Sequence, residues 1–388
     1  MPSYSEIVTS SIKNFVEHDK TTTLSDIMLQ VMETLLEAER NTFLCEKESF
    51  ETNKGNGHYQ RFVKSLSGKI LLRIPRDRLG HFKPALLEVM KNDEERLAHL
   101  ACRLYTKGMS QRDISDVIQD IYETELSASW ISRMSKDVEV VRTDWHTRPL
   151  SEKYFAIFID ALFVPIRRDC VSKEAFYVAL GLKADGTREI LGLYTLPGES
   201  SEGWSMVISD LKKRGIKDVS LFIADGLSGL PDEIQNVFPA TRFQSCVVHK
   251  MRNILLKVRP THKKEVASGL KEIFNLDLTD DDPERASIRL RVFIDKWSTI
   301  YPHLERQFPE DLISHLFTYL TFPPTIRRMI YTTNWIERLN KHIRKVIKNK
   351  NSFPSEDSAM NLIFLAVTDF EQRVYKFPIY KIASLQEI

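Results

Sequence analysis

The sequence has little cysteine, and the few cysteines are scattered. No Cys-x-x-Cys pair occurs, so the sequence supports neither a disulfide framework nor a four-cysteine zinc site. A reducing compartment is the natural interpretation. With only 14 glycines and 16 prolines in 388 residues, a collagenous or low-complexity chain is also excluded. The cysteines are Cys45, Cys102, Cys170 and Cys246.

Long apolar runs are missing too. No uncharged stretch approaches the roughly 20 apolar residues that a membrane span requires. The start of the chain has neither the basic segment nor the apolar core of a signal peptide, so we do not expect secretion. Hydrophobic residues make up 42% of the 388 residues, enough for a sizeable core and, by length, for two or three domains.

A strong net charge is also absent, since the formal value is only +2. The charges are nevertheless unevenly distributed. Residues 54–91 contain nine Lys and Arg against two acids, and residues 327–350 contain eight against Glu337 alone. Two such segments indicate a surface that binds a polyanion, with phosphate as the expected group. The alternative for either segment is an ordinary solvated face.

The N-terminal third predicts helices around a small hairpin. Residues 23–50 have an apolar stripe at helical spacing, which serves packing within a domain or between subunits. Residues 55–84 contain two short strand-like runs around a turn, and we expect this basic hairpin to end at Pro75.

Residues 94–141 predict a pair of helices. Ser110 and Asp113 fit a capping box that opens the first one. The length and pattern are typical of a DNA-binding helix-turn-helix, although any antiparallel helix pair looks similar. The residues left on the outer faces are Gln111, Arg112, Ser129, Trp130, Arg133 and Lys136.

From residue 154 the pattern becomes α/β. Apolar runs alternate with helical patterns, which predicts a sheet with flanking helices. Residues 262–320 show no strand-like alternation and predict helices only. The predicted strands are 154–166, 175–182, 189–196, 219–224 and 242–248, and the other predicted helices are 203–214, 230–238, 334–348 and 355–376.

Three carboxylates are the main candidates for chemistry. Asp160 and Asp225 lie in or directly after strongly apolar strands, where an ionised carboxylate is costly unless it is paired or bound to metal. The structural alternative is an Asp that caps a loop or helix. Glu337 is the single acid of a basic helix, where it either pairs with Lys341 or projects toward the two aspartates. Three carboxylates together can hold two Mg²⁺ ions for phosphoryl transfer.

The motif Cys246-Val-Val-His249 is half of a metal site. Zinc would need two more nitrogen or sulfur ligands at suitable spacing, and the sequence offers no second such motif. A role in positioning phosphate beside Asp225 is favoured over zinc, and a packed cysteine with a satisfied histidine is the remaining alternative. Arg252 and Asn253 follow one turn later and could also reach phosphate.

A set of motifs in chain order resembles the bacterial Mutator-like insertion-sequence transposases. The likeness extends from about residue 55 to about residue 370, whereas the first fifty residues match only loosely. The motifs are Ile74-Pro-Arg76-Asp-Arg78-Leu-Gly80, Gly108-Met-Ser-Gln-Arg112-Asp-Ile114, Phe158-Ile-Asp160-Ala, Ile223-Ala-Asp225-Gly-Leu, Phe243-Gln-Ser-Cys246-Val-Val-His249-Lys-Met-Arg252-Asn253 and Tyr331-Thr-Thr-Asn334-Trp-Ile-Glu337-Arg-Leu-Asn340.

The resemblance implies a DDE transposase with an RNase H-like α/β catalytic domain, a mixed five-stranded sheet with flanking helices. An all-α insertion interrupts it, and α-helical N-terminal DNA-binding domains, including the helix-turn-helix, precede it. The implied division is 1–53 helical and a candidate dimerisation region, 54–92 a small basic DNA-binding element, 93–148 helix-turn-helix, 149–257 and 326–388 the two parts of the catalytic domain, and 258–325 the helical insertion.

By the resemblance, Asp160, Asp225 and Glu337 are the catalytic triad and hold two Mg²⁺ ions, for which Mn²⁺ can substitute. The enzyme would cut its own terminal inverted repeats and join the freed 3′-OH to another phosphodiester, through a copied, circular intermediate. The supporting residues implied are Cys246, His249, Arg252, Asn253, Asn334 and Asn340.

Double-stranded DNA, as transposon ends and target, is the implied partner of a homodimer or larger assembly in the bacterial cytoplasm at the nucleoid. The alternatives are an RNase H-like nuclease or resolvase, and a transposase-derived DNA-binding protein without catalysis. The candidate DNA contacts are Arg61, Arg73, Arg76, Arg78, Gln111, Arg112, Ser129, Trp130, Arg133, Lys136, Arg338, Lys341, Arg344 and Lys345.

Overall fold

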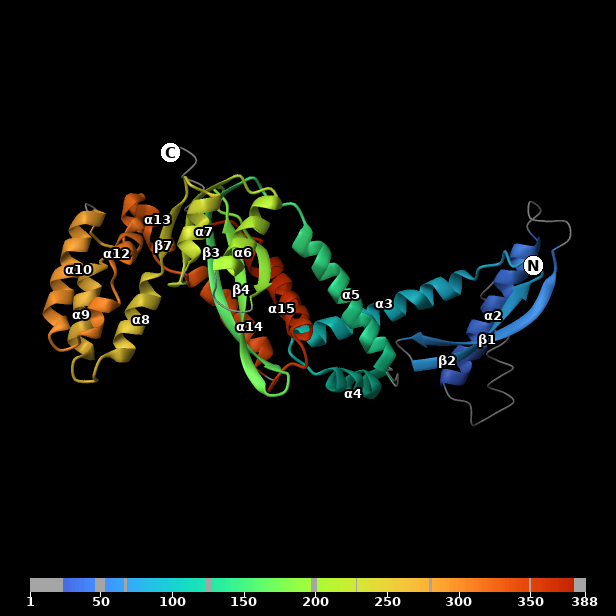
Figure 1. The fold of residues 1–388 in the computed structure, drawn as a ribbon. Coiled ribbons are helices and arrows are strands. Elements are labelled where there is room, and N and C mark those ends of the chain that lie inside the picture. The colour runs from blue at the N-terminus through green and yellow to red at the C-terminus, as the bar shows by residue number, and fades with distance from the viewer. Residues whose placement is uncertain are drawn as a thin grey trace. The chain divides into compact units, whose positions relative to one another are not determined.

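The structure is a computed structural model. It describes residues 24–45, 53–65, 68–122, 128–196, 201–227, 229–278, 281–348 and 350–379. The chain divides into two compact units, Met1–Lys136 and Asp137–Ile388, which are described in turn (Figure 1).

The first unit packs helices against a hairpin. Strands β1 (Gly55–Ser65) and β2 (Gly68–Asp77) pair antiparallel. Alternation along β2 turns Leu72 and Ile74 into the core and leaves Arg73 exposed. The alternation breaks at the buried Pro75, and Arg76 is exposed as well. The helices are α2 (Leu24–Cys45), α3 (Ala85–Thr106), α4 (Gln111–Tyr122) and the first residues of α5 (Ala128–Thr147).

Two local expectations have different outcomes. The capping box is confirmed, because the Ser110 N–H donates to Asp113 Oδ2 at 3.0 Å and the Asp113 N–H donates to Ser110 Oγ at 3.1 Å. The expected strand end at Pro75 is wrong, because β2 continues to Asp77. Pro75 lies opposite His58, beside an irregularity in the register, and a two-stranded sheet has no inner strand whose hydrogen bonds a proline would remove.

The second unit is built on a five-stranded mixed sheet in the order β5-β4-β3-β6-β7. The central strand β3 pairs antiparallel with β4 and parallel with β6, and β6 pairs parallel with β7. The prediction of a mixed sheet with flanking helices is confirmed. The strands are β3 (Lys153–Arg167), β4 (Val171–Leu182), β5 (Arg188–Thr195), β6 (Asp218–Ala224) and β7 (Arg242–Ser245).

Helices pack against both faces of this sheet. On one face α6 (Ser201–Lys213) and α7 (Leu230–Val237) form a core with Ile157, Ile159 and Tyr177, centred on the fully buried Trp204. Residues of β3 alternate between the faces, so Asp160 lies on the other one. That face is covered by α14 (Asn334–Ile347) and α15 (Glu356–Phe370), after which the short π-helix η2 (Glu371–Tyr375) follows.

From β7, helix α8 (Val247–Lys257) leads into a helical segment. Within its described residues, 259–330 contain no strand, as the sequence predicts. The buried Gln244 links β7 to this segment, because its amide donates to the Leu316 carbonyl at 3.0 Å and accepts from the Tyr319 N–H at 2.6 Å. The helices are α9 (Lys263–Ile273), α10 (Pro283–Ser298), α11 (His303–Arg306), α12 (Glu310–Leu316), η1 (Thr318–Thr321) and α13 (Pro324–Ile330).

Among the described helices, none combines the length and the apolar character that crossing a bilayer would need.

Candidate active site

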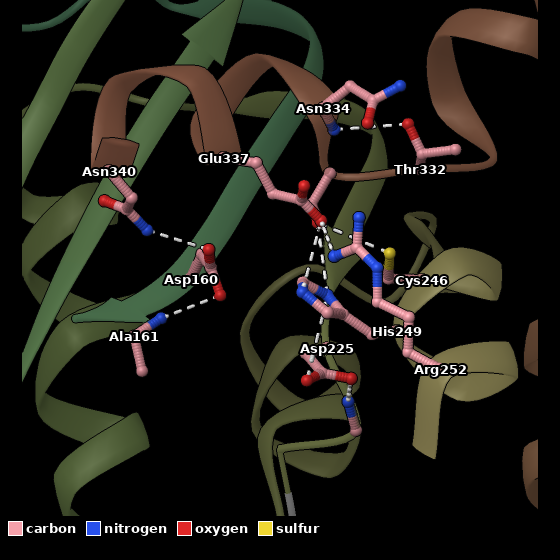
Figure 2. Close-up of polar contacts among 12 residues, drawn as sticks. Asp160, Ala161, Asp225, Cys246, His249, Arg252, Thr332, Asn334, Glu337 and Asn340 are labelled. Atoms are coloured by element: carbon pink, nitrogen blue, oxygen red, sulfur yellow. Dashed lines mark hydrogen bonds and ion pairs between the residues drawn. The ribbon is translucent and has the colours of Figure 1, made fainter. Parts of the chain in front are cut away.

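The sheet and α14 bring the three predicted carboxylates into one region. The parallel register pairs Ile159 of β3 with Ala224 of β6, so the next residues, Asp160 and Asp225, occupy neighbouring positions on adjacent strands. Glu337 lies in the first turn of α14, which packs against β3. Figure 2 shows the three side chains around His249.

Asp160 is the most deeply buried of the three, with 8% of its surface exposed. Asn340 donates from Nδ2 to Asp160 Oδ2 at 2.8 Å, and the Ala161 N–H donates to Oδ1 at 3.0 Å. Burial raises the pKa of Asp160 to about 6, against the positive charge of His249 and these two hydrogen bonds. The neighbouring Asp225 adds to the rise. The carboxylate therefore lacks part of the compensation that its negative charge requires.

His249 connects the other two carboxylates. Its Nε2 lies 3.2 Å from Glu337 Oε1, and its Nδ1 lies 3.8 Å from Asp225 Oδ2. Hydrogen bonding to the Cys246 side chain raises the pKa of His249 to about 9, against the opposing effect of burial. The charges of Asp225 and Asp160 raise it further. The raised pKa favours a positively charged ring between these two carboxylates at neutral pH.

Helix α8 supplies a second cation and a thiol. Arg252 donates from Nη1 to Glu337 Oε1 at 3.1 Å, so this oxygen faces two positive groups. Cys246 is the buried N-cap residue of α8, and its N–H donates to the Ala224 carbonyl at 2.8 Å. The Thr333 hydroxyl lies 3.3 Å from both Cys246 Sγ and His249 Nδ1.

The donor atoms suggest two sets of metal ligands. Asp160, Asp225 and Glu337 offer only carboxylate oxygens, which hard cations such as Mg²⁺ prefer. Asn340 bonds to Asp160 through Nδ2, and among the described residues its buried Oδ1 has no hydrogen-bond partner. Separately, Cys246, His249 and Glu337 each place one ligand atom within 4.8 Å of the others.

The predicted supporting residues lie at different distances from this cluster. Asn340 contacts Asp160 directly, through the hydrogen bond from its Nδ2. Asn334 is exposed at the start of α14 and Asn253 is exposed on α8; among the described contacts, neither side chain bonds to the carboxylates. Sequence reasoning missed Thr333. Its position directly before α14, the N-cap, is the signal that was available.

The predicted DNA contacts lie mostly on exposed faces. Helix α14 has a buried apolar face, and its basic residues point to solvent. The side chains of Ser129, Trp130 and Arg133 lie outside the described residues. The exposed candidates are Arg61, Arg73, Arg76, Arg78, Gln111, Arg112, Lys136, Arg338, Lys341, Arg344 and Lys345.

Comparison with known proteins identifies the family. The model of the family described as "Transposase, Mutator family" matches residues 5–376, so the chain belongs to the Mutator family of transposases. The transposase for insertion sequence element IS1201 of Lactobacillus helveticus is 33% identical over 88% of this chain and 93% of its own length. The transposase for insertion sequence element IS256 in transposon Tn4001 of Staphylococcus aureus is 30% identical over 94% of this chain and 93% of its own.

Among solved structures, a chain of the Drosophila P element transposase strand transfer complex matches with a TM-score of 0.31 and 11% identity. The match covers 74% of this chain and 83% of that chain.

Proposed function

We propose that this protein is a DDE transposase in which Asp160, Asp225 and Glu337 form the catalytic triad. The observation that carries the proposal is the meeting of these carboxylates, from β3, the end of β6 and α14, in a family of transposases. The substrate is double-stranded DNA, namely the terminal inverted repeats of the element that encodes the protein and a target site. The reaction is cleavage of the transposon end, followed by attack of the freed 3′-OH on another phosphodiester.

The strand arrangement supports an RNase H-like catalytic domain. Its first three strands, β3, β4 and β5, form an antiparallel meander, and β6 and β7 extend the sheet in parallel from the other side of β3. The helical segment then separates the strand that ends at Asp225 from the helix that carries Glu337, which supports an all-helical insertion near 258–325. The proposed helix-turn-helix consists of α4 and α5, and the basic hairpin of the first unit is the second DNA-binding element.

The residues present fit a divalent cation. A buried carboxylate whose pKa is raised to about 6, beside a second carboxylate, is stabilised by any cation that binds there. Asp160, Asp225 and Glu337 would hold the two Mg²⁺ ions, and Mn²⁺ is expected to substitute. When bound, Mg²⁺ supplies Lewis-acid stabilisation of the attacking and leaving oxygens of a phosphodiester.

Residues around the three carboxylates orient them and offer contacts to DNA phosphates. Asn340 fixes the orientation of the Asp160 carboxylate through its 2.8 Å hydrogen bond. Arg252 is more than half exposed, and its guanidinium can exchange Glu337 for a phosphate oxygen. The exposed basic face of α14, around Arg338 and Arg344, supplies backbone contacts beside the carboxylates. Base contacts from the helix pair, through residues such as Arg112, give the choice of sequence.

We also propose an assembly state, a location and a route for the reaction. The protein acts as a homodimer or larger assembly on its DNA ends, in the cytoplasm at the nucleoid. A copying route through a circular intermediate follows from the family resemblance.

The test is single-strand cleavage of a DNA duplex that carries the repeat flanking the gene. Wild type, Asp225→Asn and Glu337→Gln are compared in Mg²⁺, in Mn²⁺ and in EDTA, with DNA binding measured in parallel. We expect metal-dependent cutting at the repeat tip by wild type alone, with binding retained by all three. Cutting by either variant at the wild-type rate would overturn the assignment of that residue.

Two outcomes separate the alternatives. Cleavage that follows DNA shape, and never joins the 3′ end to a second duplex, would indicate a nuclease or resolvase. Tight binding of the repeat with no cutting by any form would indicate a transposase-derived DNA-binding protein.

A further inference from the structure

A second ligand set overlaps the proposed triad. Cys246 and His249 lie three positions apart, at the N-cap and in the first turn of α8, and so share one side of the helix. Sequence alone offers no partner for this pair. The structure supplies one from α14, because Glu337 brings its carboxylate to within 4.8 Å of both ligand atoms. The set is therefore one sulfur, one nitrogen and one oxygen.

We propose that Cys246, His249 and Glu337 form a binding site for one thiophilic divalent cation, of the class of Zn²⁺ or Co²⁺. Three protein ligands with a solvent molecule in the fourth position are a common arrangement for such ions. A thiolate ligand favours Zn²⁺ over Mg²⁺, which prefers oxygen alone. The site is distinct in chemistry from the three-carboxylate set, although the two share Glu337.

The distances suit a tetrahedral ion. Zinc bonds of about 2.0–2.3 Å place neighbouring ligand atoms about 3.3–3.6 Å apart. His249 Nε2 and Glu337 Oε1 are 3.2 Å apart, so these two ligand atoms already have nearly the separation that a tetrahedral zinc site requires. The sulfur lies within 4.8 Å of the other two ligand atoms, so it needs to approach by up to about 1.2 Å to reach the tetrahedral separation of about 3.6 Å. The backbone of Cys246 is held by its 2.8 Å hydrogen bond to Ala224, so this approach would come from rotation of the side chain.

The surroundings of His249 match those of a metal ligand. With Nε2 toward the ion, Nδ1 faces the Thr333 hydroxyl at 3.3 Å and the Asp225 carboxylate at 3.8 Å. Histidines that bind metals commonly donate their second ring N–H to a carboxylate, which fixes the tautomer and orients the ring. Binding must also displace Arg252 from Glu337, which is feasible because 56% of the arginine side chain is exposed.

Because both ligand sets include Glu337, occupation of one affects the other; this step rests on the proposed function. A Zn²⁺ ion bound to the thiol set withdraws Glu337 from the Mg²⁺ set, so the two ions compete. The transposase would then be held inactive by zinc at concentrations far below those of Mg²⁺.

The test is metal binding by the full chain, stripped with a chelator and free of DNA. Co²⁺ is titrated while its thiolate charge-transfer absorption is recorded, and Zn²⁺ then displaces Co²⁺ to give the zinc affinity. We expect one Co²⁺ per chain with the thiolate band, and loss of the band in Cys246→Ser. Glu337→Gln and His249→Gln should each weaken zinc binding by more than about 100-fold, since even loss of an outer partner costs 10–100-fold.

The controls separate this site from other thiols and from the triad. Cys170 is exposed, so Cys170→Ser should keep the band, and Asp160→Asn should keep both the band and the zinc affinity. Circular dichroism confirms that each variant is folded. A band that persists in Cys246→Ser, or no thiolate band in wild type, would overturn the proposal. This metal titration involves no DNA cleavage, so its failure leaves the proposed function intact. Conversely, a chain that binds Co²⁺ here but cuts no DNA in the separate cleavage assay contradicts only the proposed function.

Discussion

Two buried aspartates, one in each unit, behave in opposite ways. Asp77 ends β2 in the first unit and is 4% exposed, whereas Asp160 lies within β3 of the second unit and is 8% exposed. The pKa of Asp77 is lowered to about 2, and the pKa of Asp160 is raised to about 6. Loss of solvent alone therefore does not decide the state of a buried carboxylate.

The difference lies in the donors around each group. Burial by itself would raise the pKa of Asp77, but hydrogen bonds from the Asn53 amide and from the N–H groups of His81 and Phe82, at 2.9, 3.0 and 3.2 Å, outweigh it. Asp160 has fewer such bonds and a second carboxylate nearby. A carboxylate that protein donors satisfy is structural, whereas one left short of donors gains most from a bound cation.

The largest expected difference between the two aspartates is in the rate of DNA cleavage after each carboxylate is neutralised. Asp160→Asn is expected to lower the rate of strand cleavage about 1,000-fold or more, equivalent to about 4 kcal/mol of barrier, because a metal ligand is lost. Asp77→Asn should leave the cleavage rate at saturating DNA unchanged. Both are measured on the same repeat-bearing duplex, and equal losses in the two variants would contradict the contrast.

The stability of the hairpin region should depend on Asp77 and not on Asp160. Asp77→Ala leaves the N–H groups of His81 and Phe82 without their acceptor and should destabilise the hairpin region by about 3 kcal/mol. Hydrogen exchange of the backbone amides from residue 53 to residue 82 measures this loss. The same amides in Asp160→Asn should exchange at the wild-type rate.

The pH dependence of that protection provides a further control. Because the pKa of Asp77 is lower in the folded chain than its usual 3.8, the stabilisation is fully present above about pH 4. It is lost as the pH falls toward 2, since the carboxylate then takes up a proton that the hydrogen bonds disfavour. In Asp77→Asn this part of the acid sensitivity should disappear.

A smaller effect is expected from the partner of Asp160. Asn340→Ala removes the amide that orients the carboxylate and should lower cleavage by about 10–100-fold. If Asn340 acts by positioning, the Mg²⁺ concentration for half-maximal cleavage rises, a change that a purely structural role would not cause. The measurement is a Mg²⁺ titration of cleavage. An unchanged Mg²⁺ requirement would contradict the positioning role.

The smallest effects should come from the exposed basic residues near each aspartate. Arg76→Ala, near Asp77, and Arg338→Ala, near the triad, should each weaken DNA binding about equally across sequences and reduce the slope of affinity against salt by about one. Lys217 is the matched control, because this exposed lysine is paired with Glu152. Fluorescence anisotropy at several salt concentrations distinguishes the three variants, and a lost slope in Lys217→Ala would show that any surface cation contributes.

The sequence by itself determined the elements and the candidates for chemistry. Continuous apolar runs identify β3 and β6, and the carboxylates Asp160 and Asp225 stand out against them because a charge in such a run is costly. Helical spacing likewise identifies the two faces of α14. These signals are local, so they can be recognised in the sequence without knowledge of the fold. The family resemblance added the assignment of Asp160, Asp225 and Glu337 to one catalytic triad.

The tertiary structure alone decided which residues meet. Strand β6 pairs with β3, although β4 and β5 lie between them in the chain. That order brings Glu337 to His249 and Arg252 on α8 rather than to Lys341 on its own helix. The hydrogen bond between Asn340 and Asp160 joins positions 180 residues apart. Local periodicity carries no information about such pairs, because they depend on which faces of distant elements are buried together.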